Sequence, residues 1–216
     1  GKKRGFKDEI EQRGNVFDKI LEIIEVKKPS AYFLENVQHI VKHDDGNTFK
    51  YIESKLRKAG YSFYFKVIKA SDFGLPQYRP RTFMVGFRDE DINEQYFKFP
   101  KPIKLKMSMS DVFGGNCTRD IGLTLRQGGA CSPSGDRRNW DGYIVDGKLV
   151  RLDAKHGKIM QGFPDNFYLP DSRSKAMRLL GNSVAVNVVF NIGKQIQKYL
   201  LHKESFKDEN RQLAFI

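Results

Sequence analysis

The feature that most constrains the fold is an alternation of helix-period and strand-period apolar segments in the first hundred residues. Apolar residues recur at helical spacing over 17–24 and 49–56, and these segments stop before Pro29 and Gly60. Short apolar runs typical of strands lie at 31–35, 61–68 and 82–87. Because strands separated by helices favour crossover connections, the pattern predicts a parallel sheet of the doubly wound α/β plan over residues 1 to 100.

The pattern changes after Lys98. Prolines at 100 and 102 and glycine pairs at 114–115 and 128–129 interrupt a stretch of weak periodicity, which predicts a smaller, loop-rich domain over residues 101–170. Residues 171–216 are expected to return to the first domain through a helix. Its apolar stripe is Val184, Val188, Ile192 and Ile196.

The charge balance indicates a polyanionic partner. Lysine and arginine outnumber aspartate and glutamate by 38 to 26, which leaves a formal charge of +12 and a pI near 9.6. Twelve basic and six acidic residues lie between Lys98 and Lys158, so half of the excess is there. We expect nucleic acid to bind this stretch, and a basic but otherwise ordinary enzyme is the alternative.

The two cysteines, Cys117 and Cys131, form no CxxC pair, and the sequence suggests neither a disulfide framework nor a zinc site. His39 and His43 are four residues apart, but a solvated helix face is the expected role because no third ligand is evident. No apolar run reaches the length of a membrane span, and no signal peptide opens the sequence, so an intracellular protein is expected.

The strand at 31–35 ends abruptly in Glu35 and Asn36. In a doubly wound sheet ligands bind beyond the carboxyl ends of strands, which would place both side chains at an active-site crevice. An acid at a strand end can instead cap the next helix, and the sequence leaves this alternative open.

Three further motifs carry polar groups. Arg79 and Arg81 flank a proline just before the apolar run at 82–87, so their loop is stiff and suits planar oxygen acceptors. The motif IMQGFPDNF follows at 159–167. The last, LLGNSVAVNVV at 179–189, is predicted to open a long helix whose amino terminus could bind an anion.

Taken in order, ENV, QYRPR, a variable basic stretch, QGFPD and GNSV resemble the carboxyl-terminal part of the DNA (cytosine-5)-methyltransferases. The opening GKKRGFKDE and the following RGNVFDKILEII are similar to the loop and helix after that family's Pro-Cys-Gln nucleophile motif. The resemblance covers nearly the whole chain. It implies part of a doubly wound, S-adenosylmethionine-dependent methyltransferase sheet with a small target-recognition domain, and double-stranded DNA as the partner.

The resemblance also implies roles for individual residues. Glu35 would contact ring nitrogen 3 and the exocyclic amine of a flipped cytosine, sharing a proton, and Arg81 would contact oxygen 2 with Arg79 nearby. Asn36 and Gln77 would support the loop geometry. For the cofactor, the residues beside the methionine moiety would be Asn182 and Ser183.

The basic stretch occupies the place of the family's target-recognition region. The expected DNA contacts there are Arg126, Arg137 and Arg138, with Asn139 as a base reader. For any single arginine, phosphate contact or plain solvation is a more frequent role than base reading. Trp140 is expected to anchor the core.

The sequence departs from the family in three respects. It contains no Pro-Cys pair, and both cysteines are rejected as nucleophiles because they lie in the recognition region. It lacks the glycine-rich turn that would hold the cofactor's nucleotide, and it has AKHGK at 154–158 where the family has an arginine–glutamate pair. About half of an enzyme is therefore expected.

A chain that opens at Gly1 without methionine suggests a truncated polypeptide, or a split enzyme whose amino-terminal half is a partner subunit. We expect no methylation from this chain alone, and an exposed apolar sheet edge. The family further implies restriction-modification in a prokaryotic cytoplasm, associated with the nucleoid. The alternative from another class is a non-catalytic DNA-binding subunit or degenerate homologue.

Overall fold

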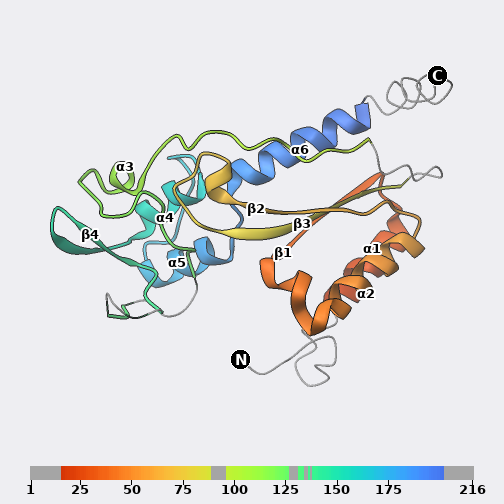
Figure 1. Cartoon of the computed structure of the whole chain (residues 1–216), viewed down its shortest axis with the longest axis horizontal. Coiled ribbons are helices and arrows are strands. Elements are labelled where there is room, and N and C mark those ends of the chain that lie inside the picture. Colours follow the sequence, from red (N-terminus) through yellow and green to blue (C-terminus); the bar gives the residue numbers. More distant parts are fainter. Residues whose placement is uncertain (1–15, 89–95, 127–130, 134–135, 137, 202–216) are drawn as a thin grey trace. The chain divides into compact units, whose positions relative to one another are not determined.

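The computed structural model describes residues 16–88, 96–126, 131–133, 136 and 138–201. These residues divide into two compact units (Figure 1). The first comprises the described residues within Gly1–Val67, Arg81–Phe99 and Lys194–Ile216, and the second those within Ile68–Pro80 and Pro100–Gly193. The division differs from the three domains expected from the sequence, whose functional boundaries stay a prediction.

A three-stranded sheet contains β1 (Ala31–Val37), β3 (Pro80–Phe87) and β2 (Tyr64–Lys69), in that order. Strand β1 pairs antiparallel with β3, and Glu35 lies opposite Phe83. The prediction of an entirely parallel sheet was therefore wrong for β3. A strand that runs parallel to the preceding strand needs a long crossover connection, which is usually helical. The segment from β2 to β3 contains only the three-residue helix η3 (Ala70–Asp72), so it does not provide such a crossover.

One face of the sheet is covered by α1 (Val16–Lys27) and α2 (Asn47–Lys58) (Figure 1). Both helices were predicted from their apolar spacing, and their buried residues lie at that spacing. Between β1 and α2 the chain forms the 3-10 segment η2 (Gln38–Gly46). The core under the helices contains Leu21, Ile24, Tyr32, Phe49, Ile52, Leu56, Tyr61, Phe63 and Met84.

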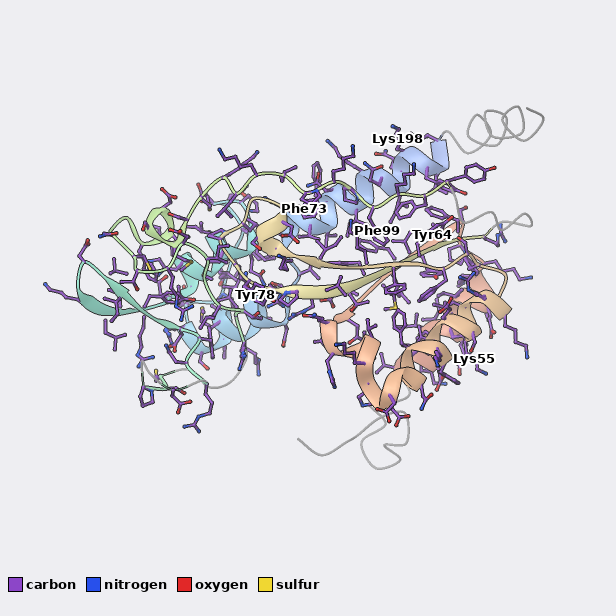
Figure 2. All side chains as sticks on the ribbon, viewed as in Figure 1. Lys55, Tyr64, Phe73, Tyr78, Phe99 and Lys198 are labelled. Carbon is purple, nitrogen blue, oxygen red and sulfur yellow. The ribbon has the colours of Figure 1, made fainter. Side chains whose placement is uncertain are left out.

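The opposite face carries aromatic residues. Phe87 of β3 packs against Tyr199, with ring centroids 4.0 Å apart, and Phe97 contacts both Tyr64 and Phe99. Tyr199 belongs to α6 (Val186–Leu201), and the labelled rings of Tyr64 and Phe99 lie between this part of α6 and the strands in Figure 2. Alternation along β1 and β3 assigns Glu35 to the same face as Phe87.

The second unit contains α3 (Met109–Phe113), α4 (Ala154–Gln161), α5 (Arg173–Asn182) and a hairpin of β4 (Gly142–Val145) and β5 (Lys148–Arg151). The hairpin turns at Asp146 and Gly147, whose φ angles of 50° and 75° suit a two-residue turn of type I′. Trp140 is 2% exposed, which confirms its expected place in the core. Its buried neighbours in that core are Met109, Val112, Cys117, Leu125, Tyr143, Val145, Leu152, Met160, Met177 and Leu180.

The GNSV motif does not open a helix. Gly181 and Asn182 end α5, Ser183 is its carboxyl-terminal cap, and α6 begins only at Val186. The hydroxyl of Ser183 donates to the carbonyl of Leu180 at 2.8 Å, which satisfies one of the helix's last carbonyls. The predicted long helix is present as α6, but the prediction that Gly181, Asn182 and Ser183 form its amino terminus was wrong. Among the described helices, none combines the length and apolar character needed to cross a membrane.

Candidate active site and nucleic-acid interface

Glu35 and Arg81 form an ion pair between neighbouring strands. The Oε1 atom of Glu35 lies 2.9 Å from Nε of Arg81. Glu35 is opposite Phe83 and Arg81 is opposite Val37, so the two side chains are diagonal neighbours on one face of the sheet. The antiparallel register thus brings together two residues that are 46 positions apart in the sequence.

This pair is partly withdrawn from water, with 30% of the Glu35 side chain and 17% of the Arg81 side chain exposed. Burial lowers the pKa of Arg81, and the attraction of Glu35 partly offsets that effect. The geometry opposes the helix-cap alternative for Glu35, since η2 begins at Gln38 and its capping residue is Val37, with no side-chain cap hydrogen bond. Asn36 supports the strand end instead, because its Oδ1 accepts from the backbone of Val37 at 2.8 Å.

Arg79 points into the second unit and is only 3% exposed. Its Nη1 donates to the carbonyl of Leu125 at 3.0 Å, and its Nη2 donates to the carbonyls of Gly181 and Ser183. The guanidinium therefore joins the chain at Leu125 to the end of α5. These contacts favour a positioning role over direct contact with a base.

Gln77 is fully buried and extends the same network. Its Nε2 donates to the carbonyl of Met160 at 3.0 Å and to Oε1 of Gln161 at 3.1 Å, while its Oε1 accepts from the backbone of Leu125. Gln161 in turn donates to the carbonyl of Leu180 and to the hydroxyl of Ser183. We call Gln77, Arg79, Gln161 and Ser183 the buried polar network, which links the QYRPR, QGFPD and GNSV motifs.

The two expected cofactor residues differ in their surroundings. Ser183 uses its hydroxyl within the buried polar network, so its contribution to a ligand would come through positioning of the chain. Asn182 is exposed at the carboxyl-terminal end of α5. The side-chain amide can both donate and accept, and the carboxyl-terminal end of a helix favours cations, so this position suits a ligand's ammonium group.

The expected DNA contacts also divide by exposure. Arg126 and Arg138 are exposed, and Arg137 lies outside the described residues. Arg138 forms two parallel hydrogen bonds with Asp136, from Nε to Oδ1 at 3.1 Å and from Nη2 to Oδ2 at 2.6 Å. Hydrogen bonding from Arg138 lowers the pKa of Asp136 to about 2.

Asn139 is 9% exposed, and its amide closes a turn. Its Oδ1 accepts from the backbone N–H of Gly142 and its Nδ2 donates to the carbonyl of the same residue, both at 3.0 Å. With both amide atoms used, the geometry favours a structural role over the expected reading of a base.

Sequence reasoning missed Asp141, whose side chain is fully buried. It forms ion pairs with Arg151 at 3.0 Å and Arg173 at 3.2 Å, and it accepts from the backbone N–H of Cys131. A single aspartate in a turn region belongs to no sequence motif. Its position between Trp140 and Tyr143, which are both buried, is the feature of the sequence that could have indicated a buried acid.

The remaining candidate ligands are the histidines and the two cysteines. Nδ1 of His43 lies 2.7 Å from the hydroxyl of Thr48. Within the described ranges no group of three or more histidine, cysteine or acidic side chains could hold a metal ion. Cys117 is buried and Cys131 is exposed, and both are free thiols. Arg13, in the motif RGNVF, lies outside the described residues.

Two solved methyltransferase structures share the fold of this chain. The chain is similar to a DNMT2 variant of Spodoptera frugiperda, with a TM-score of 0.64 and 17% identity over 87% of this chain and 73% of that chain. It is also similar to the methyltransferase EhMeth of Entamoeba histolytica, with a TM-score of 0.59 and 17% identity over 87% of this chain and 69% of that chain.

The sequence comparison defines the family. The sequence model of the C-5 cytosine-specific DNA methylases matches residues 1–126 and 124–198. The chain belongs to this family, as the resemblance implied. Members of the family use S-adenosylmethionine as the methyl donor.

Two relatives show how much of a whole protein the chain represents. It is 32% identical to the type II methyltransferase M.HhaI of Haemophilus parahaemolyticus, over 91% of this chain and 72% of the relative. It is 36% identical to the type II methyltransferase M.HaeII of Haemophilus aegyptius, over 88% of this chain and 66% of the relative.

Proposed function

We propose that this chain supplies the base-binding and DNA-recognition part of a methyltransferase acting on carbon 5 of cytosine in double-stranded DNA. The observation that carries the proposal is the ion pair of Glu35 and Arg81, at 2.9 Å on adjacent strands, in a chain of this family. A module that only binds DNA has no need of an acid and an arginine held together on one sheet face.

The chemistry explains why these two groups serve together. Carbon 5 of cytosine is a poor nucleophile until a thiolate adds to carbon 6, which places negative charge around ring nitrogen 3 and oxygen 2. Glu35, sharing a proton with the base, contacts nitrogen 3 and the amine, and Arg81 donates to oxygen 2. When cytosine enters, the ion pair opens and each partner turns to the base. When bound, S-adenosylmethionine would supply the methyl group, and Asn182 would contact its amino-acid moiety.

Two groups needed for turnover come from outside these 216 residues. The sequence contains neither a Pro-Cys pair nor a glycine-rich turn after a strand, and the chain spans 66% to 72% of the two relatives described above. We propose that both groups belong to an amino-terminal half, in the same polypeptide or in a partner subunit.

The recognition surface is proposed to include Arg126 and Arg138, with Arg137 as a further contact. Leu125, next to Arg126, is held on both backbone atoms by Gln77 and Arg79, so this arginine projects from a fixed backbone. Because the relatives are type II methyltransferases of bacteria, we propose a restriction-modification role in the prokaryotic cytoplasm, at the nucleoid.

The test mixes this chain with a polypeptide carrying the cysteine and glycine-rich motifs, duplex DNA and methyl-labelled S-adenosylmethionine. Label on cytosine in the mixture alone is the expected result. DNA binding without label in the mixture would instead support the non-catalytic DNA-binding subunit, and label from this chain by itself would require a nucleophile among its own residues.

A variant pair tests the roles of the residues. We expect Glu35→Gln to lower turnover by about 100-fold or more, the usual loss for one aimed group at a developing charge, with DNA affinity within about threefold. Glu53→Gln is the matched control, because Glu53 pairs with Arg57 at 2.9 Å and is 35% exposed. Unchanged turnover in Glu35→Gln would overturn the assignment.

A further inference from the structure

Asp141 is the most deeply buried ion-paired acid in the described part of the second unit, and nothing in the proposed catalytic chemistry uses it. Its side chain is 0% exposed, yet it faces two arginines whose side chains are 29% and 42% exposed. Burying a carboxylate costs free energy unless hydrogen bonds and opposite charges compensate for the lost hydration. The buried position of Asp141 therefore requires that the segments bearing its partners stay fixed around it.

The contacts of Asp141 join three separate segments. Oδ1 accepts from Nη1 of Arg151 on β5, and Oδ2 accepts from Nη2 of Arg173 at the start of α5. Both oxygens accept from the backbone N–H of Cys131, at 3.1 and 3.3 Å. The carboxylate thus connects the hairpin, a helix and the chain at Cys131.

Each arginine makes a second contact that strengthens the connection. Nη2 of Arg151 donates to the carbonyl of Ser132 at 3.2 Å, and Arg173 donates from Nε and Nη2 to the carbonyl of Leu152. Arg151 therefore holds Asp141 and Ser132 at once, which a planar guanidinium can do and a lysine ammonium cannot do with the same geometry.

The chain at Cys131 and Ser132 leads to Arg138, the exposed arginine proposed to contact DNA. A short set of turns organises the approach, since Asp136 donates its backbone N–H to the carbonyl of Pro133 and Asn139 donates to that of Asp136. The start of this segment is held at Cys131 and its end at Asn139, two residues before Asp141.

We propose that Asp141 is a positioning residue for DNA recognition, which fixes the described residues of the segment 131–138 on the framework of β5 and α5 and so sets how Arg138 meets a base pair. The inference rests on the proposed function. It concerns discrimination between sequences rather than the total strength of DNA binding, because Asp141 itself is buried and negatively charged.

The experiment uses the whole 216-residue chain. A duplex library with a randomised centre is captured by the unmodified protein and by Asp141→Asn, and the bound fraction is sequenced. We expect the preference of the unmodified chain for its best sequences to fall at least tenfold in Asp141→Asn, with affinity for the unselected library changed less than threefold. Hydrogen exchange at the Cys131 amide should accelerate in the same variant.

Two further variants keep the result interpretable. Asp120→Asn makes the same charge change at an exposed position of the second unit and should keep the preference. If Asp141→Asn fails to fold, Arg151→Lys replaces it, since the variant keeps the charge but loses the simultaneous hold on Asp141 and Ser132, and it should show the same loss of preference.

The outcomes separate this inference from the proposed function. Retained preference in a folded Asp141→Asn or Arg151→Lys protein overturns the positioning role and leaves the proposed function standing. Faster exchange at Cys131 with unchanged preference overturns it as well, because the segment would then be held without affecting recognition. An unmodified chain that binds DNA with no preference overturns both this inference and the recognition surface.

Discussion

At the scale of single residues, Gly86 of β3 leaves the least room for a side chain among the described glycines. A Cβ atom there would lie 2.1 Å from the carbonyl oxygen of Ser62 and 2.2 Å from the ring of Tyr32. We expect Gly86→Ala to lower the free energy of unfolding by at least about 2 kcal/mol, because the strand lies between two others and cannot move aside. Chemical denaturation of the whole chain measures this.

Gly193 of α6 is the control for that substitution. A Cβ atom at Gly193 meets nothing within 4 Å, so Gly193→Ala should raise the free energy of unfolding by about 0.5 to 1 kcal/mol through better helix formation. Equal effects of the two substitutions would contradict the tight approach of Gly86 to Ser62 and Tyr32.

A second prediction at this scale concerns the pair of Asp136 and Arg138. The pKa of Asp136 is lowered from 3.8 to about 2, so the contact is fully present above pH 3.8 and is lost as the pH falls through about 2. In Arg138→Gln the midpoint should rise toward 3.8, which NMR titration of the Asp136 carboxyl would detect. A midpoint that stays near 2 would mean that the backbone N–H of Arg138, 2.7 Å away, holds the carboxylate by itself.

Single residues also show the limit of reading the sequence. Glu35 and Arg81 were predicted as a functional pair from their motifs, and the structure brings them together. The burial of Arg79 could not be predicted, because its carbonyl partners lie at least 46 positions away in the sequence, and the turn that Asn139 closes with Gly142 matches no motif that the sequence offers. Asp141 was missed because its arginine partners are 10 and 32 positions away.

At the scale of elements, the buried polar network makes the QYRPR loop, α4 and α5 depend on one another. Gln77→Leu keeps the volume of the side chain but leaves the N–H of Leu125 and the carbonyl of Met160 without their glutamine partner. We expect a loss of about 2 to 4 kcal/mol in the free energy of unfolding, since each buried unsatisfied group costs about 1 to 3 kcal/mol.

Gln197→Leu, at an exposed position of α6, is the matched control and should change the free energy of unfolding by less than about 0.5 kcal/mol. Denaturation curves of both variants test the difference. If Gln77→Leu is as stable as Gln197→Leu, the loop is held by its backbone contacts, such as that of Tyr78 with Gly122, and the glutamine is dispensable.

Elements differ in how far the sequence defines them. Helices α1 and α2 were predicted because one apolar face repeats at helical spacing and a proline or glycine follows. The direction of β3 was not predicted correctly. Its six consecutive buried residues, Thr82 to Phe87, are equally compatible with a strand that runs parallel or antiparallel to its neighbour. The break after Asn182 was missed because two of the side chains that hold Ser183, those of Arg79 and Gln161, lie outside the motif.

At the scale of the whole molecule, the charge of +12 predicts that the proposed DNA binding depends strongly on the salt concentration. Each neutralised phosphate releases counterions, so the slope of log affinity against log salt counts the phosphate contacts. Half of the basic excess lies between Lys98 and Lys158, and within this stretch Arg126 is exposed on a backbone fixed by Gln77 and Arg79. This side chain should therefore contribute one contact to the slope.

We expect Arg126→Ala to reduce the magnitude of the salt slope by about one, with similar weakening on unrelated duplexes, as measured by fluorescence anisotropy between low and moderate salt. Lys19→Ala removes an equal charge from α1, where Lys19 pairs with Glu22 at 2.8 Å, and should leave the slope unchanged. Equal reductions in both variants would mean that the total charge, rather than the recognition stretch, determines binding. A loss confined to particular sequences in Arg126→Ala would instead assign this arginine to a base, because phosphate contacts carry no sequence information directly.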